Sequence, residues 1–224
     1  MNIFPSYKCN LNCSFCFIKK NKSALLPLEW LQNIIQEVNP KTINILGGEP
    51  SILNYSYLEE LIELSISATN KVPSLYTNGT NILDLFQKTN LIISYDPCDR
   101  EKQDKVFSNM LSISVPFSVS MILTENLLNN GIHFLKRVSS INNVKSIDLC
   151  NMYDRYGNNL STYDISDIIN ISDKITYMSE KEWTFDECLK VLPNKTFLIE
   201  TRDHKKPKLF TDINQAKQYF RSIR

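Results

Sequence analysis

The 224-residue sequence lacks any apolar run close to the roughly 20 residues needed to cross a bilayer. It has no charged N-terminal region followed by a hydrophobic run, and so shows no secretory signal. Internal repeats and low-complexity runs are also absent. These absences, with 42% hydrophobic and 22% charged residues, predict a globular cytoplasmic protein without a membrane partner.

Histidine is scarce, with only two residues, and cysteine is unevenly placed. The six cysteines are Cys9, Cys13, Cys16, Cys98, Cys150 and Cys188. The first three, called here the cysteine triplet, fall within eight residues, whereas a secreted disulfide scaffold is usually shorter and more evenly stapled. In a reducing cytosol, clustered thiolates more often bind a metal.

Charge is unevenly distributed although the formal net charge is only +1. Residues 190–224 carry nine Lys/Arg against three Asp/Glu, which leaves this segment at +6 and residues 1–189 at −5. A basic segment can meet phosphate or an acidic partner. A solvated surface is the interpretation favoured by the composition alone.

Short apolar stretches alternate with longer amphipathic ones, a pattern typical of strand–helix units and a parallel sheet. The expected strands are 2–5, 42–46, 72–76, 90–94, 116–122 and 144–149. The expected helices are 28–38 (after Pro27), 55–68, 81–88, 101–110 and 127–139.

These units predict an α/β fold, a partial (βα)6 TIM-like barrel over residues 1–155. A full eight-unit barrel needs about 250 residues, so an open, curved six-stranded sheet is expected. Residues 156–224 are expected to form an irregular C-terminal extension with a strand at 196–200 and a helix at 213–222.

Unusual polar clusters follow nearly every predicted strand. They are the cysteine triplet, GGEP (47–50), TNGT (77–80), SYDPCD (94–99), TEN (124–126) and CNMYDRYGN (150–158). Because ligands gather at the carboxyl ends of parallel strands, this arrangement predicts a site at that edge of the sheet.

Two metal centres suit the triplet. Iron–sulfur clusters are held by thiolates, ordinarily four, so three cysteines would leave one iron open to a non-protein ligand. A Cys3His zinc site would need His133, inside a predicted helix, or His204, in the distant basic segment. The cluster is therefore favoured over zinc.

The stretch CNLNCSFC, with Phe15 before the last cysteine, resembles the C-x3-C-x2-C signature of the radical S-adenosylmethionine (SAM) superfamily. GGEP after the second strand resembles a second motif of that family, and the strand–helix order extends the likeness to about residue 155. The resemblance implies one 4Fe–4S cluster on Cys9, Cys13 and Cys16, with SAM chelating the fourth iron. An external electron donor would reduce the cluster, and reductive cleavage of SAM would give a 5′-deoxyadenosyl radical that abstracts hydrogen from a substrate.

Further roles follow from this resemblance. Gly47 and Gly48 would let the backbone approach the ligand, Glu49 would accept a hydrogen bond from the SAM amino group, and Pro50 would fix the turn. The remaining expected contacts with SAM are Phe15 (adenine), Ser94 and Asp96 (ribose), Thr124 or Asn126 (methionyl or ribose), and Asn78.

Cys98 and Cys150 are candidate hydrogen donors to a substrate radical, although a purely structural role as small buried hydrophobic residues is the favoured interpretation. Arg155, within 153–158, is a candidate for binding a substrate carboxylate or phosphate. Only Cys188 lies beyond residue 150, so a single cluster is expected.

The sequence does not identify the substrate, although a peptide or other large molecule would suit an open edge. Two alternatives stay open. One is a metal-stabilised nucleic-acid-binding protein that uses the basic segment. Nucleic acid is a less favoured partner than SAM. The other is a catalytically silent cluster-binding regulator.

Overall fold

A computed structural model describes residues 1–16, 18, 24–151, 163, 165–177, 189–199 and 207–222. The strands are β1 (Asn2–Ile3), β2 (Asn44–Ile45), β3 (Ser74–Thr77), β4 (Asn90–Ser94), β5 (Phe117–Leu123), β6 (Val144–Asn151), β7 (Ile175–Tyr177), β8 (Leu189–Val191), β9 (Phe197–Ile199) and β10 (Lys208–Phe210). The α-helices are α1 (Leu28–Val38), α2 (Tyr55–Thr69), α3 (Gln103–Ser112), α4 (Glu125–Asn130), α5 (Ile132–Ser139), α6 (Ser166–Ile169) and α8 (Ile213–Ser222). Two 3-10 helices are η1 (Pro50–Ile52) and η2 (Asp84–Lys88).

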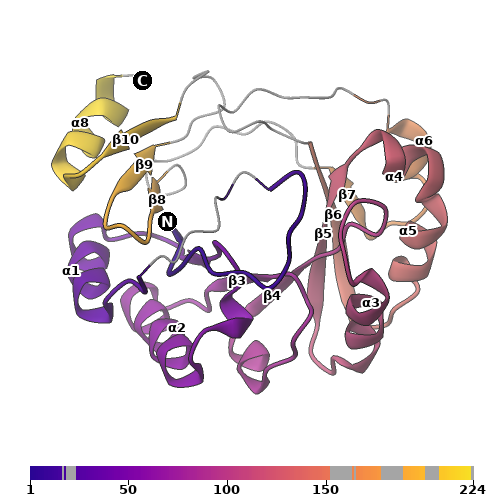
Figure 1. Ribbon diagram of the computed structural model, residues 1–224, viewed down its shortest axis with the longest axis horizontal. Helices are drawn as coiled ribbons and strands as arrows, with labels where there is room; N and C mark the ends of the chain where they lie inside the picture. The colour runs from indigo at the N-terminus through magenta and orange to yellow at the C-terminus, as the bar shows by residue number, and fades with distance from the viewer. Residues whose placement is uncertain are drawn as a thin grey trace.

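All ten strands join one sheet in the order β10-β9-β8-β1-β2-β3-β4-β5-β6-β7. Neighbours from β8 through β7 are parallel, whereas β9 is antiparallel to β8 and to β10. Figure 1 shows the sheet bent into an arch, with α1 and α2 outside one arm and α3, α4 and α5 outside the other. The segment after β1 (indigo) lies inside the arch. The open, mostly parallel α/β architecture predicted from the sequence is confirmed.

The six predicted strands and the helices at 28–38 and 55–68 are present, but two other helices differ. The region predicted as a helix at 81–88 forms only η2. The helix predicted at 127–139 is divided into α4 and α5 at Gly131, whose N–H still donates to the Leu127 carbonyl at 2.7 Å. Glycine weakens a helix interior, which explains the break.

The expectation of an irregular extension is wrong for much of its described part. Although 197–199 and 213–222 form the predicted strand and helix, β7, β8 and β10 also join the sheet. Each of these three strands has only three residues, too few for alternation to show in the sequence. A domain boundary at 155/156 stays a prediction.

The two faces of the sheet differ in polarity. Along β5, Val119 and Met121 are buried in the core beneath the helices, while Ser118 and Ser120 on the other face are only half-buried. Strands of parallel sheets are usually apolar on both faces because both are covered. Here the inner face of the arch carries hydroxyl, thiol and carboxylate groups, which suit a polar ligand.

No helix among the described residues combines the length and the apolarity needed to cross a membrane.

Candidate active site

The cysteine triplet lies in the loop that leaves β1. Cys9 and Cys13 are half-buried and Cys16 is exposed, and none of the three forms a disulfide. The Cys16 N–H donates to the Cys13 carbonyl at 3.2 Å, which closes a tight turn between these two cysteines. All three thiols are thus available as ligands, on a short segment at the carboxyl end of β1.

The glycines of GGEP pack this loop against the end of β2. A Cβ atom on Gly48 would lie 2.0 Å from the Lys8 carbonyl oxygen, and one on Gly47 would lie 2.9 Å from the Ser6 oxygen. The Gly48 and Glu49 N–H groups donate to the Ser6 and Lys8 carbonyls at 3.0 and 2.7 Å. Close backbone approach therefore explains both glycines, and it is an approach to the chain that leads into Cys9.

A network of side chains attaches the triplet to β3. The Asn78 amide donates to Asn10 Oδ1 at 2.8 Å and lies 3.9 Å from Cys9 Sγ. Its oxygen accepts from the Thr80 hydroxyl at 2.7 Å, and that hydroxyl accepts from the Asn10 amide at 2.8 Å. Asn78 was predicted to contact the cosubstrate; the structure places it beside a predicted ligand cysteine.

Glu49 is buried, at 2% exposure, and bridges the ends of β2 and β3. Its Oε1 accepts from the Thr77 hydroxyl at 2.6 Å and from the Ser51 N–H at 2.9 Å. Its Oε2 accepts from the Asn78 N–H at 2.6 Å. The carboxylate therefore holds the neighbouring strand ends in position. Its predicted bond to a ligand amino group remains a prediction.

Replacing Glu49 with glutamine should destabilise the fold by about 1–3 kcal/mol, because one oxygen becomes an NH2 group facing a buried donor. Urea unfolding measures the loss. Glu63→Gln is the matched control, since Glu63 is largely exposed and only 3.5 Å from Lys88 in a surface ion pair. Equal stability of the Glu49→Gln protein and the wild type would contradict the bridging role.

A second group of residues occupies the loop after β4. Asp96, 3% exposed, forms an ion pair of 2.6 Å with Arg100, and its Oδ1 accepts from the Ile122 N–H at 2.8 Å. The Arg100 guanidinium lies 5.4 Å from the centre of the Phe15 ring. Asp96 and Phe15, both predicted to contact SAM, are thus joined through Arg100, which the sequence analysis did not select. The spacing of four residues between Asp96 and Arg100 is the signal that was available.

Electrostatics link this arginine to the cysteine triplet. Burial raises the pKa of the Cys13 thiol, and the Arg100 charge acts in the opposite direction. Charges on Cys16 and Cys9 raise the Cys13 pKa further. Because a metal ligand must be a thiolate, Arg100 favours the form of Cys13 that binds metal.

Thr124 and Asn126, which follow β5, form hydrogen bonds with the loop after β4 (the β4 loop). The Thr124 hydroxyl donates to Asp99 Oδ2 at 2.6 Å and accepts from the Leu127 N–H at 3.0 Å, which caps α4. The Asn126 amide donates to the Cys98 carbonyl at 2.8 Å. Burial, then the charge of Asp99, raises the pKa of the Cys98 thiol. These residues hold the β4 loop in shape, and their predicted contacts with SAM remain predictions.

The inner face of the arch brings together residues from β3, β5 and β6. Cys150 Sγ lies 3.7 Å from the Ser120 hydroxyl, and Asp148 Oδ1 accepts from the Thr176 hydroxyl at 2.6 Å. Burial raises the pKa of Tyr76 to about 12, and charges on Cys150 and Asp148 add to this effect. Tyr76 therefore remains a protonated donor near the predicted hydrogen donor Cys150. Tyr76 was missed because its alternation with buried Leu75 and Thr77 spans only four residues.

The donor set fits an iron–sulfur cluster in its chemistry. Three thiols and no histidine lie in the described part of the loop, and His133 on α5 packs on Phe134 with ring centres 3.9 Å apart. Among the described residues, no three His, Cys, Asp or Glu side chains converge closely enough for one metal ion. His204, Cys188 and the loop 153–158 with Arg155 lie outside the described residues.

Comparison with known proteins agrees with this picture. Residues 3–97 match a family model described as "Radical SAM superfamily". A 7,8-dihydro-6-hydroxymethylpterin dimethyltransferase of Methanocaldococcus jannaschii is 33% identical over 92 residues, which is 38% of this chain and 18% of that protein. The match therefore spans less than a fifth of the length of this relative.

A solved structure described as "Native anSMEcpe with bound AdoMet" has the same fold, with a TM-score of 0.53 and 22% identity. The likeness covers 73% of this chain and 55% of that one. The family match contains the cysteine triplet, GGEP, Asn78 and Asp96, the residues around which the site is built. Residues 3–97 of the chain are therefore similar to the radical SAM superfamily.

Proposed function

We propose that this protein is an enzyme that cleaves SAM reductively and uses the resulting radical to abstract hydrogen from a substrate. One observation carries the proposal. Three unpaired thiols lie on a single loop, which the Gly47–Gly48 backbone and the Asn78 side chain attach to the ends of β2 and β3. This placement, within the region that matches the family model, suits a cluster with one iron open to SAM.

The residues around the triplet would act by holding and orienting. Cys9, Cys13 and Cys16 would bind three irons of one 4Fe–4S cluster, which when bound supplies the electron that cleaves the sulfonium. Glu49 would position the strand ends, and Arg100 would support the thiolate form of Cys13. We keep Gly47, Gly48, Pro50, Ser94 and Asp96 as proposed neighbours of SAM.

The substrate side of the site would be the inner face of the arch. The Tyr76 hydroxyl and the Asp148 carboxylate offer a donor and an acceptor, which favours a substrate with hydrogen-bonding groups over a hydrocarbon. Of the two candidate hydrogen donors, we favour Cys150, which shares this face with Ser120, over Cys98 on the β4 loop. A peptide substrate, a one-electron donor and a cytoplasmic location remain parts of the proposal.

Anaerobic reconstitution with iron and sulfide, followed by dithionite and SAM, tests this function. The wild-type protein is expected to release 5′-deoxyadenosine and methionine. Cys13→Ala should release neither, while Cys188→Ala should match the wild type because Cys188 is not a proposed ligand. Absence of 5′-deoxyadenosine from the wild type, or its undiminished release by Cys13→Ala, would contradict the proposal.

A further inference from the structure

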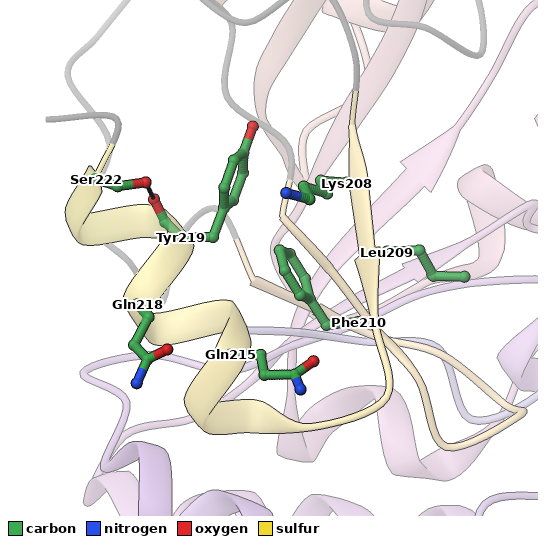
Figure 2. A pocket seen from close by; sticks show the side chains of 7 residues that line it. All are labelled: Lys208, Leu209, Phe210, Gln215, Gln218, Tyr219 and Ser222. Atoms are coloured by element: carbon green, nitrogen blue, oxygen red, sulfur yellow. Dashed lines mark hydrogen bonds between the residues drawn. The ribbon is translucent and has the colours of Figure 1, made fainter.

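A hollow of about 550 Å³ lies between β10 and α8. Figure 2 shows its lining, with Lys208, Leu209 and Phe210 on the strand and Gln215 and Tyr219 among the helix residues. Neither the loop that carries the cysteine triplet nor the inner face of the arch contributes residues to this hollow. The hollow therefore needs an explanation separate from the proposed radical chemistry.

The orientation of α8 places the hollow at the outer edge of the sheet. Ala216 and Phe220 are buried, and Lys217 reaches inward to Glu37 on α1, with 3.3 Å between Nζ and Oε1. Gln215 and Tyr219 lie about half a turn from Lys217, since residues advance by about 100° along a helix. This side of α8 consequently faces away from α1 and lines the hollow.

The strand that lines the hollow, β10, is an edge strand. In the described part of the chain, β10 pairs with β9 on one side and with no strand on the other. The backbone groups of an edge strand can pair with an added extended segment. The hollow lies between this strand and α8, so a segment added at the free edge would run beside it.

The side chains here combine an aromatic floor with positive charge. The Phe210 and Tyr219 ring centres are 5.4 Å apart, and Lys208 Nζ lies 4.6 Å from the Tyr219 ring centre. Lys208 forms no ion pair with an acidic group of the described chain. Asp212, at the start of α8, caps this helix by accepting from the Asn214 and Gln215 N–H groups.

We propose that this hollow docks an extended acidic peptide, which adds to β10 as a further strand and lays apolar side chains on Phe210 and Tyr219. The positive charge at Lys208 would select acidic residues. It would also oppose pairing with β10 of a second copy, which would bring like charges together across the new ladder. The proposal is independent of the cluster and does not require the radical chemistry to be correct.

Fluorescence polarisation with the full chain tests the proposal. The probe is a fluorescein-labelled peptide that alternates glutamate with valine. One control peptide carries N-methyl groups on alternate amides, which prevents ladder pairing, and another carries lysine in place of glutamate. Saturable binding is expected for the glutamate peptide alone, with slowed amide exchange at residues 208–210 in the complex.

The Lys208→Glu variant should bind the glutamate peptide about tenfold more weakly and should gain affinity for the lysine peptide. Lys71→Glu, which reverses an exposed charge in the turn before β3, should bind like the wild type. Equal binding of the N-methylated peptide, no saturable binding, no response to Lys208→Glu, or a dimer by light scattering would each overturn the proposal. Release of 5′-deoxyadenosine by Lys208→Glu should equal that of the wild type, which separates the two proposals.

Discussion

Gly48→Ala is expected to reduce the iron bound after reconstitution to near background. The new Cβ would lie 2.0 Å from the Lys8 carbonyl oxygen and 2.6 Å from the Lys8 carbonyl carbon, and neither backbone atom can rotate away. The chain before Cys9 must then separate from β2, which breaks the hydrogen bonds from the Gly48 and Glu49 N–H groups. Loss of these bonds should also lower the free energy of unfolding by about 2–4 kcal/mol.

Gly131→Ala provides the matched control for this experiment. Its Cβ would also be crowded, 2.4 Å from Leu127 Cδ1, but at the junction of α4 and α5 rather than beside the cysteine loop. We expect it to lower the thermal midpoint while leaving the iron content per folded chain unchanged. Normal iron binding by Gly48→Ala, or loss of iron in both variants alike, would contradict the assigned role of Gly48.

Arg100→Met should destabilise the protein by about 3–5 kcal/mol, because it leaves the buried Asp96 carboxylate without its ion-pair partner. The double variant Asp96→Asn/Arg100→Met should be more stable than the single one, since no charge then remains buried. Urea unfolding of the four proteins in this cycle gives the coupling free energy. Additive effects would show that the ion pair is not the source of the loss.

The effect of Arg100→Met should also depend on pH. Burial raises the pKa of Asp96 and Arg100 opposes that rise, so removal of Arg100 raises the pKa of the folded state further. A carboxyl whose pKa is higher in the folded than in the unfolded state loses stability as pH rises from the unfolded toward the folded value. The deficit of the variant should therefore grow between acidic and neutral pH. A constant deficit would point to lost packing on Phe15.

Much of the grouping of residues around the cysteine triplet could be predicted because its signals are local. The triplet and GGEP are short contiguous motifs, and the carboxyl ends of parallel strands necessarily share one edge. Several hydrogen-bond partners at this site, in contrast, are far away from one another in the sequence. Glu49 meets Thr77 and Asn78 only once β2 and β3 pair, and Asn10 meets Thr80 across seventy residues.

Three further strands of the sheet, β7, β8 and β10, could not be predicted from the sequence pattern. Strands of three residues, such as β8, do not establish a period, so the neighbour of β1 on its other side could not be foreseen. The positions of β10 at the sheet edge and of α8 beside it depend on the pairing of β8 with β1, which the sequence did not predict. The basic composition of residues 190–224 was visible, but the position of Lys208 on an edge strand was not.

The most direct measurement of the central claim is iron and sulfide analysis of the anaerobically reconstituted protein, followed by electron paramagnetic resonance of the reduced form with and without SAM. We expect about four iron and four sulfide per chain and a spectrum that changes when SAM is added. About eight of each, no cluster at all, or a spectrum indifferent to SAM would contradict a single cluster with an open iron on Cys9, Cys13 and Cys16.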